Sequence, residues 1–217
     1  MPVYSERLRA ALFLAERAHR GQIRKGREVP YVLHPVCVAT LLFAAGADED
    51  LVCAGYLHDV VEDSEVTLAE IEERFGAHVA HLVDAVTERK QEPDGTSIPW
   101  DVRRRDTIEH LTDARYDVIA LKGADVAINM GDVVLDHGEV GDALWERFNA
   151  PAAAQLWYYR RVAQIVLERG TYRLIDDELR SRLAQLEDIT ASLAADPPSS
   201  SADRPSSADR PTPAHRP

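Results

Sequence analysis

An all-α fold is predicted for this chain by three features of its sequence. Between residue 3 and about residue 193, apolar side chains recur every three or four positions, the spacing of amphipathic helices. The same region contains no pair of alternating runs joined by a hairpin turn, and no alternation of strands with helices. The chain has 217 residues, 45% of them hydrophobic, which is enough for one well-filled core. We therefore expect a compact bundle of many helices in one domain.

The N-terminal part of the chain is expected to form three helices. The first covers about 4–19, where "SERLRAALFLAERAHRG" places apolar side chains on one stripe, as in an amphipathic helix and unlike a signal peptide. The second contains "PVCVATLLFAAG" and ends at Gly46. The third is "DEDLVCAGYLHDVVED", residues 48–63, which begins with acids where the helix dipole favours them.

The later helices follow from start and stop signals. Thr67 and Glu70 have the spacing of a capping box at the start of "TLAEIEERFG", and Gly76 ends that helix. The stretch "AHVAHLVDAVTE" continues as the next helix, and the polar loop "RKQEPDGTSIPWD" follows it. Apolar periodicity then predicts four more helices, near residues 102–112, 115–136, 151–169 and 173–193.

The helical domain is expected to cover residues 1–195, and residues 196–217 are expected to form a disordered tail. The composition changes at residue 196 to Pro, Ser, Ala, Asp and Arg, and "SSADRP" occurs twice in succession. Such a segment cannot bury enough apolar area to offset its chain entropy. The charges of Asp and Arg in the tail cancel, so the formal net charge of -12 lies on the folded part.

Charge and composition exclude several classes of protein. A net charge of -12 and a pI near 5.1 argue against a nucleic-acid or anionic-membrane binder, which needs clustered Lys and Arg. No stretch approaches the roughly 20 apolar residues that span a bilayer. Both cysteines, Cys37 and Cys53, lie in apolar stretches and are expected to be buried, reduced thiols. We expect a soluble, cytoplasmic protein, in which a phosphate ligand would need a local basic patch or a metal.

Charged side chains are concentrated in "GYLHDVVED", residues 55–63, within an otherwise apolar stretch. A solvated helix face is the ordinary explanation of such charges, but the apolar neighbours leave little room for one, and burying unpaired charge costs several kcal/mol. In a continuous helix, adjacent His58 and Asp59 diverge by about 100° and could both bind a metal between them. Glu62 and Asp63 would lie one turn along, near water bound to that metal.

A metal centre would need further ligands from elsewhere in the chain. His34 precedes Pro35 at a helix start, and alone it would more often be a structural histidine. Asp125 lies in an apolar helix, where Lys122 one turn before it could satisfy its charge instead. Together with His58 and Asp59 these residues form a mixed nitrogen and oxygen set, which suits Mn²⁺, Fe²⁺ or Zn²⁺ better than Mg²⁺ or Ca²⁺.

The order of these residues, His34, His58–Asp59 and Asp125, resembles the H…HD…D signature of HD-domain metal-dependent phosphohydrolases. The stretches "AHRGQIRK", "PYVLHPVCVATLL", "AGYLHDVVEDSEVTLAEIEERFGAHVAHLVDAVTE" and "LKGADVAIN" are more specific. They are similar to the hydrolase domain of RelA/SpoT-type alarmone enzymes, particularly the single-domain small alarmone hydrolases. The resemblance covers about residues 5–135. It implies an all-helical fold in which the four residues hold one Mn²⁺.

The resemblance also implies a reaction and roles for further residues. The reaction is removal of the 3′-pyrophosphate from ppGpp and pppGpp, which releases pyrophosphate and GDP or GTP. Glu62 and Asp63 would act on the attacking water, and we favour Glu62 as the base because its side chain reaches farther. Arg27 would add local positive charge. The residues expected to bind the nucleotide are Arg24, Lys25, Lys122 and Asn129.

The stretch "ADVAINMGD" departs from the family's usual "ADRLHNMRT" pattern. Val126 replaces an Arg, and Gly131 and Asp132 replace an Arg and a Thr, so the substrate is less defined than the reaction type. Hydrolysis of another nucleotide, such as ppApp, is therefore one alternative. A catalytically inactive nucleotide-binding module is another, although a pure binder would not need the two acids. The partner in each case is a small-molecule nucleotide, and the sequence defines no oligomeric state.

Overall fold

The fold of the protein, described by a computed structural model for residues 5–191, confirms the all-α prediction. Within these residues the structure contains no strand, only two isolated bridges, Ile23 with Pro30 and Gln91 with Ser97. The expected tail over 196–217 lies outside the described residues. The helices are α1 (Glu6–Ala18), α2 (Leu33–Ala44), α3 (Glu49–Leu57), α4 (Val60–Asp63), α5 (Leu68–Phe75), α6 (Ala77–Val86), α7 (Trp100–Thr112), α8 (Tyr116–Val140), the 3₁₀ helix η1 (Gly141–Arg147), α9 (Ala152–Arg169) and α10 (Arg173–Thr190).

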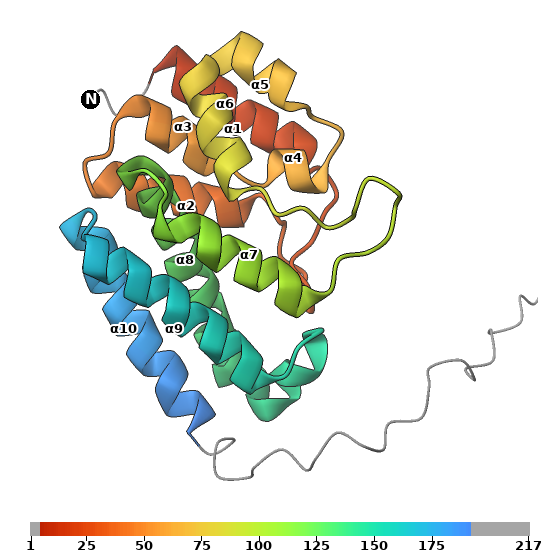
Figure 1. The fold of residues 1–217 in the computed structure, drawn as a ribbon, viewed down its shortest axis with the longest axis vertical. Coiled ribbons are helices and arrows are strands. Elements are labelled where there is room, and N and C mark those ends of the chain that lie inside the picture. The colour runs from red at the N-terminus through yellow and green to blue at the C-terminus, as the bar shows by residue number, and fades with distance from the viewer. Residues whose placement is uncertain (1–4, 192–217) are drawn as a thin grey trace, which may run out of the picture.

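Helix α8 is the central element of the bundle. Figure 1 shows α1 to α6 in the upper half of the molecule and α9 and α10 in the lower half, with α8 passing between them. Helix α8 contacts α2, α3 and α6 on one side and α9, α10 and η1 on the other. Its first three turns are buried almost without interruption, which is typical of a helix surrounded by others. Residues of α8 can therefore reach side chains from both halves.

Local signals account for several helix ends. The Asp48 side chain accepts a hydrogen bond from the backbone N–H of Leu51, and Thr67 accepts one from that of Glu70. Only this half of the predicted capping box forms, because the Glu70 carboxylate pairs with arginine side chains instead. Gly76 ends α5 with φ of 92°, a conformation that other residues rarely adopt.

The prediction of one continuous helix over 48–63 is wrong. Helix α3 ends at Leu57 and α4 begins at Val60, with Asp59 at φ of -99° and ψ of -8°. The His58 ring donates a hydrogen bond from Nδ1 to the carbonyl of Gly55, and the Asp59 carboxylate accepts one from the Tyr31 hydroxyl. These contacts hold the His58 and Asp59 side chains at a break between two helices. The positions that one continuous helix would give to Glu62 and Asp63, one turn further along, therefore do not apply.

Helices α2 and α3 approach closely at Gly55. A Cβ added to Gly55 would lie 2.8 Å from Leu42 Cδ1 and 3.0 Å from the Cα of Ala39. Such distances require the two helices to separate, because the Ala39 contact is with backbone. The absence of a side chain at Gly55 thus allows the middle of α2, the helix that carries His34, to pack against the end of α3.

Gly55→Ala is expected to destabilise the fold by about 1–3 kcal/mol, the usual range for an overpacked core. Urea denaturation would measure this effect. Gly138→Ala is the matched control, because a Cβ at this position on α8 would meet nothing within 4 Å. The control should be neutral or stabilising by up to about 1 kcal/mol. Equal effects of the two substitutions would contradict the close packing of α2 on α3.

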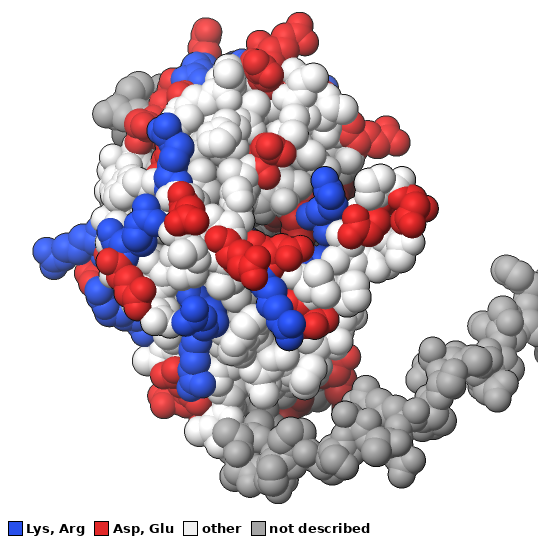
Figure 2. Space-filling model, in the orientation of Figure 1, with Lys and Arg blue, Asp and Glu red and all other residues white. Residues whose placement is uncertain are grey.

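Charges of both signs lie on the surface of the described residues. On the face drawn in Figure 2, acidic and basic side chains are interspersed, without a broad basic area. Within residues 5–191, no helix is both long and apolar enough to cross a membrane.

Candidate metal centre and adjoining cavity

Four side chains that the sequence singled out converge at one buried point. His34 comes from the first turn of α2, His58 and Asp59 from the break between α3 and α4, and Asp125 from the middle of α8. His34 Nε2 lies 3.3 Å from His58 Nε2 and 3.2 Å from Asp125 Oδ1. Asp59 Oδ2 lies 3.3 Å from His58 Nε2. The structure thus brings together the complete set of predicted ligands, from three separate parts of the chain.

The chemistry of these atoms fits a bound cation. The hydrogen bond of 2.9 Å from His58 Nδ1 to a backbone carbonyl places the proton of a neutral ring on Nδ1. The Nε2 lone pair of His58 then faces His34 Nε2 and the Asp59 carboxylate, which are also electron-pair donors. The ligand atoms of His34, His58 and Asp59 lie within 4.8 Å of one another. A divalent ion would satisfy all of them, and mixed imidazole and carboxylate ligands are typical of first-row transition metals.

Electrostatics at the centre also favour positive charge. Burial alone would lower the pKa of His58, but the carboxylates of Asp59 and Asp125 outweigh burial and raise it to about 9. Burial would raise the pKa of Asp59, yet His58 and His34 hold it below its usual value. The two carboxylates therefore remain ionised in a buried place, and a metal ion would supply the charge that balances them.

Lys122 and Asn129 each take part in holding Asp125. Lys122 Nζ lies 2.7 Å from Asp125 Oδ2, and Asn129 Nδ2 donates a hydrogen bond of 2.6 Å to Oδ1. The Lys122 pairing that the sequence left as an alternative therefore forms, while Oδ1 still faces His34. Lys122 does not lie in the cavity that contains the other predicted nucleotide-binding residues. It lines a different cavity beside Arg103 and His110.

Tyr31 is a contact of the metal centre that sequence reasoning missed. Its hydroxyl donates a hydrogen bond of 2.7 Å to Asp59 Oδ2. Burial, and then the charge of Asp59, raise the pKa of Tyr31, so the hydroxyl remains a donor. The signal was present in "PYVLHP", where Tyr31 stands three residues before His34. An aromatic residue in an apolar stretch is most often part of a core, so the sequence alone gave no reason to select it.

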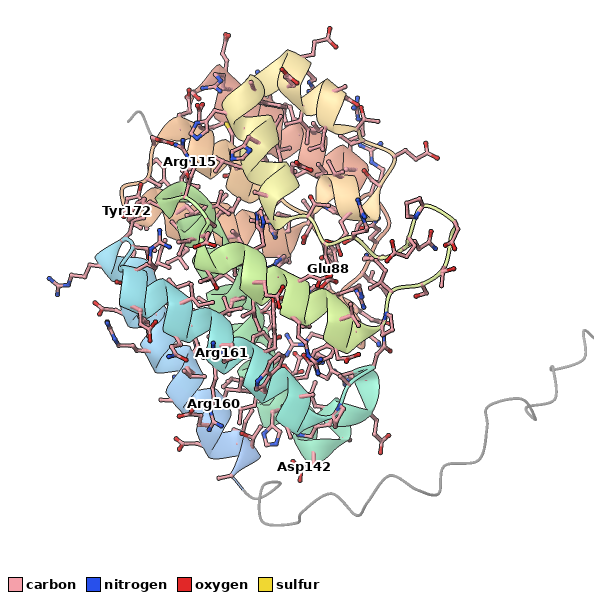
Figure 3. The ribbon with its side chains drawn as sticks, in the orientation of Figure 1. Glu88, Arg115, Asp142, Arg160, Arg161 and Tyr172 are labelled. Carbon is pink, nitrogen blue, oxygen red and sulfur yellow. The ribbon has the colours of Figure 1, made fainter. Side chains whose placement is uncertain are left out.

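Glu62 and Asp63 lie in α4, which begins directly after Asp59, and they share one lysine. Lys90 Nζ lies 3.0 Å from Glu62 Oε1 and 2.8 Å from Asp63 Oδ1. The backbone N–H of Glu88, labelled in Figure 3 between α6 and α7, donates to Glu62 Oε2. Burial raises the pKa of Glu62 although Lys90 lowers it. Sequence reasoning missed Lys90 because nothing in the polar loop distinguishes it from a solvated lysine.

A cavity of about 360 Å³ adjoins the metal centre and shares His34 with it. Arg24, Lys25 and Asn129 all line this cavity, as the sequence predicted for a binding site. Arg24 donates to Asn129 Oδ1 at 3.2 Å, and its guanidinium carbon lies 5.6 Å from the centroid of the Tyr31 ring. The remaining walls mix cations, acids and apolar groups: Arg27, Val29, Leu33, Cys37, Ile128, Asp132, Val133, Asp136, Leu144, Arg147, Phe148 and Tyr159.

The prediction that both cysteines are buried holds for Cys53 but is wrong for Cys37. Cys53 is a buried, free thiol on α3, whereas Cys37 is an exposed, free thiol on α2. The difference arises because the face of α2 that carries Cys37 borders the cavity, while the opposite face packs into the core. Apolar sequence around a residue does not show where a folded chain leaves a cavity.

Fold and site together define a helical protein with a His and Asp metal centre, and a family comparison agrees. The HD domain family matches residues 11–130, and the chain belongs to this family. It is 37% identical over 172 residues to a guanosine-3′,5′-bis(diphosphate) 3′-pyrophosphohydrolase from Danio rerio, across 77% of this chain and 87% of that relative. It is 35% identical over 133 residues to a GTP pyrophosphokinase from Myxococcus xanthus, but spans only 17% of its length.

Two solved structures share the fold of this chain. A structure described as a metazoan ortholog of SpoT that hydrolyzes ppGpp superposes with a TM-score of 0.68 at 28% identity, over 85% of this chain and 98% of that one. A protein from Listeria monocytogenes EGD-e superposes with a TM-score of 0.63 at 32% identity, over 73% of this chain and 99% of that one. The helical fold is thus shared along nearly the whole length of both structures.

Proposed function

We propose that this protein is a metal-dependent hydrolase that removes the 3′-pyrophosphate from ppGpp and pppGpp, releasing pyrophosphate and GDP or GTP. The observation that carries the proposal is the convergence of His34, His58, Asp59 and Asp125 beside a cavity that contains arginines. The likeness to the Danio rerio pyrophosphohydrolase, over most of both chains, supports the same reaction.

The metal is proposed to be Mn²⁺, with Fe²⁺ or Zn²⁺ compatible with the same ligands. When bound, it would lower the pKa of its water and polarise a phosphoryl oxygen. His58 is held in the ligating tautomer by the Gly55 carbonyl, and Asp59 is oriented by the Tyr31 hydroxyl.

A cytoplasmic location and the absence of a nucleic-acid partner stay predictions.

Glu62 is proposed as the general base. The Glu62 side chain is only 18% exposed. Burial raises its pKa, which makes it a better proton acceptor than an exposed carboxylate. The backbone N–H of Glu88 and the ammonium of Lys90 fix its two oxygens. Asp63 shares Lys90 and is proposed to orient the water.

The nucleotide is proposed to lie in the cavity next to the metal centre. Arg24 and Lys25 would contact phosphate or base, and Asn129, which is hydrogen-bonded to Asp125, would contact the ribose. Lys122 is proposed to act only through Asp125, because it lies outside this cavity.

The test is incubation of purified protein and Mn²⁺ with ppGpp, ppApp, GTP and dGTP in separate reactions, followed by anion-exchange analysis of the products. Pyrophosphate and GDP from ppGpp are the expected products. Faster turnover of ppApp would show that ppApp is the substrate instead. The observation that favours this alternative is Asp132, which lines the cavity and replaces a Thr of the usual family pattern. Bound metal without turnover of any nucleotide would contradict a hydrolase and indicate a binding module.

A further inference from the structure

The arginines of the cavity are already paired with carboxylates of the chain itself. Arg24 forms a short ion pair with Asp132. Arg27 forms another with Asp136, which also lies 3.6 Å from Arg147. A phosphate that enters the cavity therefore meets guanidinium groups whose positive charge is already partly offset by carboxylates.

These acids lie on one face of α8, in line with the metal centre. Asp125, Asn129, Asp132 and Asp136 follow one another at intervals of three or four residues, so their side chains share a face. At a rise of about 1.5 Å per residue, Asp132 lies about 10 Å and Asp136 about 16 Å along the helix from the metal ligand Asp125. The acids thus face the end of the cavity that is remote from the metal.

The ion pairs are built into the fold. The Asp136 side chain is only 12% exposed, and Arg147 reaches it from η1 across Gly26. A Cβ at Gly26 would lie 2.6 Å from Arg147 Cδ, so the glycine allows this arginine to cross. Arg24 is held independently of Asp132, by Asn129 and by the Tyr31 ring. Removal of the Asp132 charge should therefore leave Arg24 in place.

We propose that Asp132 and Asp136 are specificity-determining residues that oppose the binding of phosphate groups at the end of the cavity remote from the metal centre. Each remote phosphate must either replace a carboxylate on an arginine or share the guanidinium with it, and in both cases it lies near the acid. Arginine binds phosphate through strong, charge-assisted hydrogen bonds, so the replacement can occur, but at reduced affinity. The wild-type cavity then favours nucleotides that carry few phosphates at the 5′ position. This inference rests on the proposed function for the orientation of the nucleotide.

Kinetics provide the first test. Asp132→Asn should lower the KM for ppGpp about tenfold, the size expected for removing one like charge near a bound anion, and leave kcat within about twofold. The KM for pGpp, with one phosphate fewer at the 5′ position, should fall less. Asp136→Asn should act in the same direction. A KM for ppGpp that is unchanged or raised would overturn the proposal, because Asp132 would then only position Arg24.

Asp142→Asn is the matched control, because it removes one negative charge outside the cavity. Asp142, labelled in Figure 3, lies in η1 and pairs with His137 rather than with an arginine of the cavity. Its KM values should equal those of the wild type. A decrease equal to that of Asp132→Asn would show a general effect of net charge and overturn the proposal.

Binding without turnover separates this inference from the proposed function. In metal-free protein, calorimetry should show that Asp132→Asn tightens GTP binding about tenfold and GMP binding about threefold. Equal gains in affinity for GTP and GMP, or no gain for either, would overturn the inference even if the wild type hydrolyses ppGpp. If the wild type hydrolyses no nucleotide but the unequal gains appear, the proposed function fails and the role of Asp132 stands.

Discussion

Glu62→Gln is expected to retain the metal and to reduce kcat for ppGpp by about 10²- to 10⁴-fold, the usual contribution of a general base. The amide has nearly the same shape and can still accept a hydrogen bond from Lys90 or from the N–H of Glu88. It cannot take a proton from water. Because Glu62 is not one of the four converging candidate ligands, metal content should be that of the wild type. Metal analysis and single-turnover kinetics would measure the two effects separately.

Two further variants make the test of Glu62 specific. Glu73→Gln removes an exposed acid of α5 that contacts neither the centre nor the cavity, and should leave turnover unchanged. Asp63→Asn keeps Glu62 and should reduce turnover less than Glu62→Gln does. Normal turnover by Glu62→Gln together with a large loss in Asp63→Asn would transfer the role of base to Asp63.

The fold could be predicted because its determinants are local. Apolar spacing, the Thr67 cap and the Gly76 stop each act within one or two turns, and each is present in the structure. The break at His58 and Asp59 could not be predicted in this way. Asp59, at this break, contacts the Tyr31 hydroxyl, which comes from a segment almost thirty residues earlier in the chain. Tertiary contacts of this kind override helical periodicity.

The candidate site shows the same division between local signals, which the sequence reveals, and tertiary contacts, which it does not. His58 and Asp59 could be selected as candidate ligands because a His and Asp pair in an apolar stretch requires compensation, whatever the rest of the fold. His34 and Asp125 gave weaker signals, and each became a candidate only in combination with that pair. Lys90 and Tyr31 gave no such signal, because a lysine in a polar loop and a tyrosine near a core are both ordinary. Only the structure shows the place of Lys122, which contacts Asp125 Oδ2 and lines a different cavity from the one that Arg24 and Asn129 line.

Asp59→Ala is expected to abolish turnover and to weaken metal binding by more than about 100-fold. The loss of a mere hydrogen-bond partner of a metal ligand typically costs about 10- to 100-fold, and Asp59 is proposed as a ligand itself. The substitution also removes one of the two carboxylates that favour positive charge at the centre. Metal content after dialysis and titration with Mn²⁺ would measure the change.

Tyr31→Phe gives the graded comparison for Asp59→Ala, because it removes only the hydrogen bond of 2.7 Å to Asp59 Oδ2. Its metal affinity should fall about 10- to 100-fold, and added Mn²⁺ should restore its turnover. Asp84→Ala, an exposed acid of α6, should bind metal as the wild type does. If Asp59→Ala bound Mn²⁺ as tightly as Tyr31→Phe, Asp59 would not be a ligand. The metal centre would then have to be built from His34, His58 and Asp125, and the Asp59 carboxylate would only balance the charge of the ion.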